Sequence, residues 1–179
     1  MKLSPVIAEL RRRCPAFAKR VYGAAEFAAI DASTVLQMPC AYVLPLGESA
    51  EAFQLNTNYR QGVEQSFGVV VYVTTGANET GLEAYDHAEE IKLEVLKAIA
   101  GWCPTDEVDE VIYEGASILD LNRARLAVQF EFNVSYDIVD SETRHGVDLS
   151  ELPYLEGVNV DLTDVDSGVK ASVSLSMEN

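Results

Sequence analysis

Residues 82–100 carry the clearest helical pattern in the chain. Apolar residues recur there at spacings of three and four and would line one face of a helix, namely Tyr85, Ala88, Ile91, Val95 and Ile99. Gly101 suits the left-handed turn that ends a helix, and Pro104 cannot continue one. We therefore predict a helix that packs this face against a sheet or against a second helix.

The first thirty residues predict two shorter helices. Ser4 and Pro5 suit the N-cap and the first helical position. The helix that we predict from Pro5 runs to Arg13 and presents a short apolar face, formed by Val6, Ile7 and Leu10. Pro15 interrupts the pattern, and further apolar positions predict a second helical segment at about 24–30.

Alternation of apolar and polar residues predicts the strands. Residues 60–73 alternate and then become continuously apolar, as expected of a long strand in the middle of a sheet that is half exposed at one end. Residues 126–138 alternate throughout and are long enough to cross a whole sheet. Shorter strands are predicted at 41–44 between two prolines, and at 111–113 and 118–121 on either side of a turn at Glu114-Gly115.

Polar segments separate these elements. The stretch from Gly47 to Tyr59 is the longest candidate loop of the body, and residues 139–149 read as a loose connection. Strict alternation returns in 158–162 and 169–177 and predicts a β-hairpin whose turn is Asp164–Gly168. Because an isolated two-stranded ribbon is only marginally stable, its apolar face would cover either its own subunit or a neighbour.

These elements together predict an α+β fold. We expect a mostly antiparallel sheet flanked by helices, with a C-terminal β-hairpin extension, organised as one domain over 1–138 and an extension over 139–179. The 179 residues suffice to bury a core. No apolar run approaches the roughly 20 residues that span a bilayer, and the first residues lack the apolar centre of a secretory signal, so we expect a soluble protein.

The formal net charge of −16 is unevenly distributed. Residues 1–20 include six basic residues and one acidic residue, a net charge of +5. Residues 76–120 include two basic and twelve acidic residues (−10), and residues 136–179 include two basic and ten acidic residues (−8). The basic end and the acidic body could pair between copies, or the acidity could serve only solubility. Because the protein outside its basic N-terminal end is strongly acidic, it repels phosphate groups. We therefore do not expect it to bind nucleic acid, although DNA could pass close by.

The sequence contains no recognisable catalytic or cofactor site. It has neither a phosphate-binding glycine loop nor a dinucleotide fingerprint. The two histidines, His87 and His145, are far apart and lack a second ligand at metal spacing, and the 164–168 segment lacks the distal Glu of a calcium loop. Three dispersed cysteines suit buried or semi-buried thiols in a reducing cytoplasm, namely Cys14, Cys40 and Cys103. We predict no enzymatic activity, no cofactor and no metal.

Several landmarks occur in the order found in one protein family. They are the helix at 4–13 with Cys14-Pro15, the segment VYGAAEFAA at 21–29, PCAYVLPLG at 39–47, the segment at 61–71 ending in FGVVV, the helix ending in AIAGW before Pro104, YEG at 113–115, and the segment at 119–132. Over residues 1–138 the chain therefore resembles phage tail terminator proteins of long-tailed phages. The resemblance implies an α+β subunit that forms a hexameric ring at the head-proximal end of the tail tube. There the ring would stop tube polymerisation and offer a docking surface to the head connector.

The functional residues expected on this basis belong to assembly surfaces. We expect the 47–61 segment to project from the ring and contact tube or connector through Glu48, Asn56, Arg60 and Gln61. We also expect charge pairing between adjacent copies, with Arg11, Arg12 and Arg13 facing Asp106, Glu107, Asp109 and Glu110.

The expected partners are further copies in a hexameric ring, the tail tube protein and the head–tail connector protein. DNA would only pass through the lumen without being specifically bound, and no membrane would be involved. The expected location is the head-proximal end of the virion tail, after synthesis in the bacterial host cytoplasm. Two alternatives stay open: another head–tail connector or tail-completion protein, and a small cytosolic enzyme or regulator with an unrecognised site.

Overall fold

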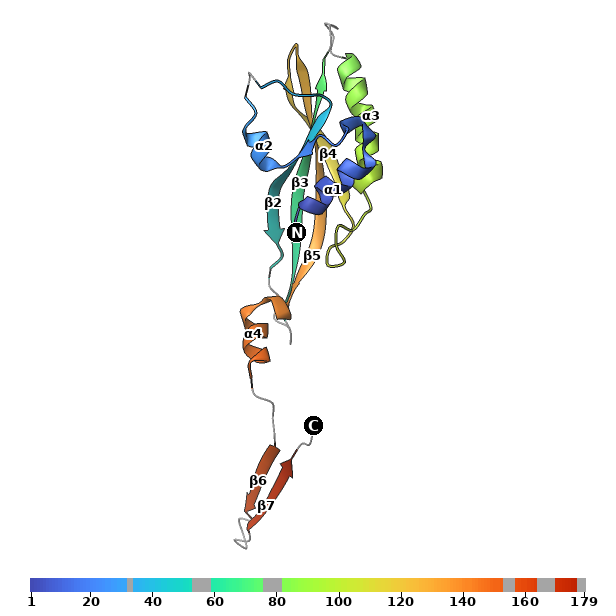
Figure 1. The fold of residues 1–179 in the computed structure, drawn as a ribbon. Coiled ribbons are helices and arrows are strands. Elements are labelled where there is room, and N and C mark those ends of the chain that lie inside the picture. The colour runs from blue at the N-terminus through green and yellow to red at the C-terminus, as the bar shows by residue number, and fades with distance from the viewer. Residues whose placement is uncertain (32–33, 53–58, 76–81, 153–156, 164–169, 177–179) are drawn as a thin grey trace. The chain divides into compact units, whose positions relative to one another are not determined.

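The structure is a computed structural model of residues 1–179, and it describes residues 1–31, 34–52, 59–75, 82–152, 157–163 and 170–176. The chain divides into two compact units, Met1–Val139 and Asp140–Asn179 (Figure 1). No helix within the described ranges has both the length and the apolar character needed to cross a membrane.

A five-stranded sheet forms the centre of the first unit, in the order β1-β2-β3-β5-β4. β1 pairs in parallel with β2, and the other neighbours pair antiparallel. The strands are β1 (Val21–Tyr22), β2 (Cys40–Ala50), β3 (Arg60–Thr74), β4 (Ile112–Leu121) and β5 (Arg125–Val139). The predicted α+β fold with a mostly antiparallel sheet is confirmed, and β3 lies in the middle of the sheet as predicted.

One face of the sheet packs against two helices, α1 (Ser4–Arg13) and α3 (Leu82–Ile99) (Figure 1). We call it the helical face. Alternate residues of the two central strands meet there, among them Phe67, Val69 and Val71 of β3 and Phe130 and Phe132 of β5. The largest buried cluster of the protein therefore lies between this face and the two helices.

Among the described residues, the opposite face is covered at one end. The five-residue helix α2 (Ala24–Ala28) and its flanking segments pack there on a smaller cluster that includes Tyr42, Val70 and Tyr72. Arg20 links the segment before β1 to the start of β2, because its Nε donates to the carbonyl oxygen of Pro39 at 3.0 Å. The three-residue 3₁₀ helix η1 (Pro15–Phe17) connects α1 to β1.

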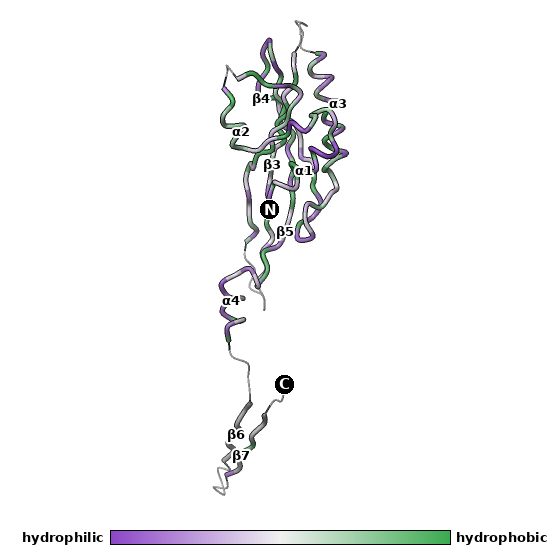
Figure 2. Tube along the Cα trace, viewed as in Figure 1, coloured by the Kyte–Doolittle hydropathy of each residue, from purple (hydrophilic) through white to green (hydrophobic). Residues whose placement is uncertain are grey.

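The predicted helices are found, with small changes at their ends and faces. α3 is amphipathic, and hydrophilic and hydrophobic residues alternate along it in Figure 2. Its buried residues are Ala84, Ala88, Ile91, Val95, Ala98 and Ile99, while Tyr85 is exposed, because the buried stripe passes through Ala84 instead. Gly101 adopts the expected left-handed conformation after the helix, with φ of 72°. At α1 the N-cap is Leu3 without a side-chain cap, so the capping role predicted for Ser4 was wrong.

Two strand predictions were wrong because each strand is longer than its apolar run. β2 continues through Pro45 to Ala50, with a register shift between Pro45 and Gly47. Only β3 pairs with β2 at this level among the described residues, so a proline is tolerated on what is an edge strand. β4 is likewise a single strand, in which the predicted turn at Glu114-Gly115 is a register shift opposite β5.

The second unit holds a short helical segment and a hairpin. The prediction of a loose connection at 139–149 was wrong, because η2 (Asp140–Glu142) and α4 (Arg144–Ser150) form there. Thr143 caps α4 by accepting a hydrogen bond from the Gly146 amide at 3.3 Å. The predicted hairpin is confirmed as the antiparallel pair β6 (Gly157–Thr163) and β7 (Lys170–Ser176). The predicted turn at Asp164–Gly168 lies outside the described residues.

Candidate assembly surfaces

The sheet has a solvated end formed by the β2–β3 hairpin and β5. Residues 45–50 of β2 are all exposed, whereas residues 40–43 are buried. The pairing of β3 with β5 nevertheless continues to its last partners, Arg60 and Val139. Regular strand structure therefore extends beyond the buried core and presents polar groups to solvent.

Three of the four residues predicted for a contact loop come together at this solvated end. Glu48 lies on β2 rather than in a loop, and its carboxylate accepts a hydrogen bond from the Tyr136 hydroxyl at 2.9 Å. Arg60 Nε donates to Asp137 Oδ2 at 2.8 Å. Gln61 Nε2 donates to the backbone carbonyl of Glu51 at 2.6 Å. We call these residues (Glu48, Glu51, Arg60, Gln61, Tyr136 and Asp137) the ribbon end; Asn56 lies outside the described residues.

These contacts explain why the ribbon end keeps a defined shape. Each of them joins different strands or a strand to its adjoining loop, and Glu51 extends the ladder because its amide donates to the Gly62 carbonyl at 2.9 Å. The Arg60 guanidinium remains 75% exposed while paired with Asp137. The ribbon end thus offers charged and hydrogen-bonding groups on a rigid strand scaffold, as protein-binding surfaces require.

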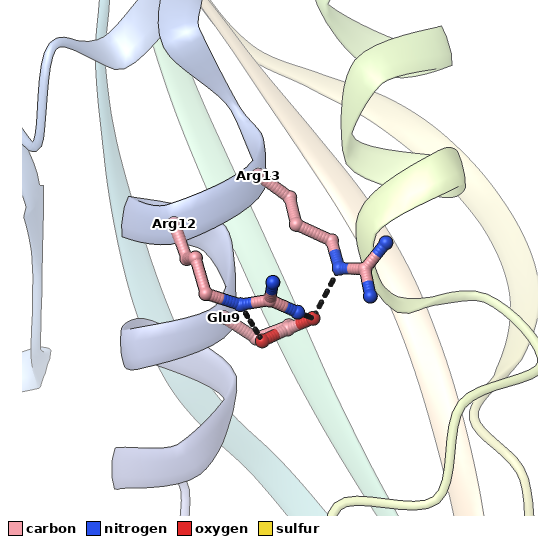
Figure 3. A network of polar contacts seen from close by, with 3 residues as sticks. All are labelled: Glu9, Arg12 and Arg13. Atoms are coloured by element: carbon pink, nitrogen blue, oxygen red, sulfur yellow. Dashed lines mark hydrogen bonds and ion pairs between the residues drawn. The ribbon is translucent and has the colours of Figure 1, made fainter.

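The three arginines at the end of α1 do not act alike. Arg12 Nε donates to Glu9 Oε2 at 2.9 Å, and Arg13 also donates to the Glu9 carboxylate (Figure 3). The hydrogen bond from Arg12 lowers the pKa of Glu9. Arg11 is different, because its Nε donates to the backbone carbonyl of Val21 at 2.9 Å and ties α1 to β1. Two exposed guanidiniums therefore share one carboxylate and leave a surplus of positive charge.

The acidic loop (Asp106–Glu110) connects α3 to β4 and is held at both ends. The Gly101 amide donates to the Val111 carbonyl at 2.8 Å, and the Asp109 amide donates to the Ser135 carbonyl of β5 at 2.8 Å. The four predicted carboxylates, Asp106, Glu107, Asp109 and Glu110, are exposed. None of them enters an ion pair in the described part of the chain. The arginines and the acidic loop are therefore not paired with each other within one copy.

Cys14 and Cys40 are buried free thiols, and burial together with the charge of Glu94 raises the pKa of Cys14 to about 12. Cys103 is exposed, so the expectation of a buried or semi-buried thiol was wrong there, because it follows the end of α3 on the surface. His87 lies on α3 and His145 in the second unit, 2.9 Å from Asp140 Oδ1. The described residues include no group of three or more His, Cys, Asp or Glu side chains that could hold a metal ion.

One exposed surface was missed by the sequence reasoning. Large apolar side chains of β4 face solvent on the outer edge of the sheet, namely Ile112, Ile118, Leu119 and Leu121. The weak signal for it was the run Ser117 to Leu121, which lacks the regular polar positions of a half-exposed strand.

Comparison with known proteins gives one family and one described structural likeness. A family model described as "Phage tail terminator protein" matches residues 1–142. A solved chain described as "Virion of native gene transfer agent (GTA) particle" shares 16% sequence identity at a TM-score of 0.46, over 74% of this chain and 92% of that chain. No curated protein sequence matches.

Proposed function

The chain belongs to the phage tail terminator protein family, and from that premise we propose that its copies form a hexameric ring that caps the tail tube. Family membership makes the protein a structural component of the phage tail with a place in the virion. The ring would stop tube polymerisation and offer the surface on which the head connector docks. The residues that we assign to contact with tube or connector are those of the ribbon end.

The observation that supports this assignment is the solvated continuation of the paired strands β2, β3 and β5 beyond the buried core. A tube grows because each added layer exposes the same surface that received it. A terminator must bind that surface and expose a different one, so it needs a defined polar contact region separate from its contacts with other copies. The ribbon end supplies such a region, and its charged groups are Glu48, Glu51, Arg60 and Asp137.

Charge supports two further parts of the proposal. A head-to-tail ring presents two different faces of each subunit to its neighbours, so Arg12 and Arg13 of one copy would face the acidic loop of the next. Exposed pairs of this kind contribute only about 0.2–1 kcal/mol each, and they would set specificity more than overall affinity. The formal charge of −16 would let DNA pass the ring without adhering to it.

The deciding experiment is to measure tails made without the protein. We expect overlong tails in electron micrographs when the gene is deleted and normal lengths when it is supplied again. A connector or joining protein would instead give tails of normal length that lack heads, and that result would contradict the proposal. Sedimentation of the purified protein, alone and with tube protein, would show whether an assembly of six copies forms.

A further inference from the structure

The outer edge of β4 has no strand beside it in the described part of one copy. Within the described residues β4 pairs only with β5, so the backbone groups on its other side have no strand partner. Four of its ten residues are large, apolar and about half exposed: Ile112 (57%), Ile118 (54%), Leu119 (47%) and Leu121 (57%). Natural sheets protect exposed edges with charges, prolines or covering segments. β4 has only two charged residues, Glu114 and Asp120, and no proline.

The hairpin of β6 and β7 also has strand edges without a described partner. It is a two-stranded sheet in a unit of its own, and an isolated hairpin is marginally stable in water. Val173 of β7 is 49% exposed. The family match ends at residue 142, before the hairpin begins. A further strand would therefore stabilise the hairpin, and a strand added to β4 would pair the backbone groups on its outer edge.

Charge decides which strand of the hairpin suits β4. The only charged residue of β6 is Asp161, whereas the only charged residue of β7 is Lys170. Both charged residues of β4 are acidic, so β6 would bring like charges together and β7 would bring opposite ones. The two strands also have comparable lengths, seven residues in β7 and ten in β4.

We propose that β7 of one copy adds to the outer edge of β4 of a second copy, so that the hairpin extends the neighbour's sheet. The inference rests on the proposed association of copies, but not on where the assembly acts in the tail. Main-chain hydrogen bonds along β4 would supply affinity, and the alternating side chains would select the orientation of the added strand.

The pleat gives the proposal a specific geometry. Ile118 and Leu121 of β4 lie opposite Val128 and Leu126 of β5, on the helical face, whereas Ser117 lies opposite Gln129 on the other face. Adjacent residues of β7 point to opposite faces. With Val173 on the apolar side beside Ile118 and β7 running parallel to β4, its neighbour Ser172 lies beside Ser117 on the other face.

Disulfide cross-linking between copies tests this geometry in the full-length chain. Cys103→Ser removes the exposed native thiol, and Ser172→Cys and Ser117→Cys are then placed in two separately tagged chains that are co-expressed. A disulfide requires Cα atoms about 4.4–6.8 Å apart. The matched control replaces Ser117→Cys by Ala116→Cys, one residue away on the opposite face. Gly115→Cys covers the next position on the Ser117 face, in case the register is shifted by two residues.

We expect a cross-link between the two different tags from position 117 or 115 and its loss from position 116. Equal cross-linking from position 116 would indicate random collision and would overturn the proposal. A disulfide formed only within one chain, when both cysteines are on the same chain, would show that the hairpin covers its own sheet and would also overturn it.

Sedimentation and tail length, measured on the same variants, separate this inference from the proposed function. Variants that assemble and limit tail length without any cross-link from positions 115 or 117 would refute the β7–β4 contact and leave the terminator role standing. Variants whose unfolding temperature falls well below that of the Cys103→Ser parent are replaced by Ser172→Cys paired with Asp120→Cys, which lies on the same face as Ser117.

Discussion

Phe67 of β3 and Phe132 of β5 are register partners, and their rings stack with centroids 5.4 Å apart and planes 17° apart. The ring of Tyr113 of β4 packs against that of Phe132, with the two ring centroids 5.5 Å apart. Both phenylalanines are fully buried beneath the helices. The contact joins three strands of the sheet at the level where the covered part gives way to the ribbon end.

Phe132→Ala should lower the free energy of unfolding by about 3–5 kcal/mol, because it removes a buried ring and leaves a cavity beneath α1 and α3. Thermal or urea unfolding followed by circular dichroism measures the loss. Phe27→Ala is the matched control, since Phe27 is only partly buried on the opposite face, and it should cost clearly less. Equal losses for the two variants would contradict the view that the helical face holds the main core.

Thiol reactivity should separate the three cysteines. Cys103 is exposed and should react with a thiol reagent in the native protein, whereas Cys14 and Cys40 are buried and should react only on unfolding. Burial raises the pKa of both buried thiols, and to about 12 at Cys14, so Cys14 should stay protonated and slow to react when the pH is raised to 9. Titration before and after denaturation counts the groups, and more than one fast thiol in the folded protein would be inconsistent with this structure.

Charge reversal at the ribbon end should abolish control of tail length without unfolding the protein. Arg60→Glu breaks the pair with Asp137, but that pair is exposed, so the unfolding temperature should stay close to that of the wild type. Tail lengths in electron micrographs give the readout. Lys97→Glu reverses an exposed charge on α3 and is the control. Tails of normal length made with the Arg60 variant would exclude this residue from the contact.

The pairing between copies should depend on Arg12 and Arg13 and be sensitive to salt. The double variant Arg12→Glu, Arg13→Glu should weaken assembly, most clearly at low ionic strength, whereas Arg11 is left unchanged because it holds the Val21 carbonyl. Adding Glu107→Arg and Glu110→Arg in the same chain should restore assembly. Sedimentation velocity across a salt series measures both effects. Assembly indifferent to salt and to reversal would mean that apolar strand contacts carry the interface.

Replacing both histidines by alanine should leave tail assembly intact. His87 lies on α3 and His145 pairs with Asp140 in the second unit, and the described residues include no group of three or more metal-ligating side chains that contains either histidine. The test counts infectious particles formed with the His87→Ala, His145→Ala protein. A loss of infectivity with normal folding would reveal a role that this structure does not account for.

Elements with a clear local period were predictable from the sequence. The stripe of α3, the alternation of β5 and the β6–β7 hairpin each follow from side chains that must alternate between solvent and a covered face. The helix α4 was missed although Thr143 is a good N-cap, because the short segment after it is polar and contains a glycine.

The ends of strands and the grouping of the candidate site depended on the tertiary structure. β2 runs past Pro45, and β4 runs through Glu114, because β3 and β5 offer backbone partners that no local pattern records. The same pairing brings Glu48 to Tyr136 and Arg60 to Asp137 across 88 and 77 residues of chain. The bare edge of β4 became visible only in the sheet order, because whether an apolar strand is covered depends on its neighbours in space. Periodicity along the chain indicates which side chains of a helix or strand point inward. Only the folded sheet decides which strand or helix lies beside them.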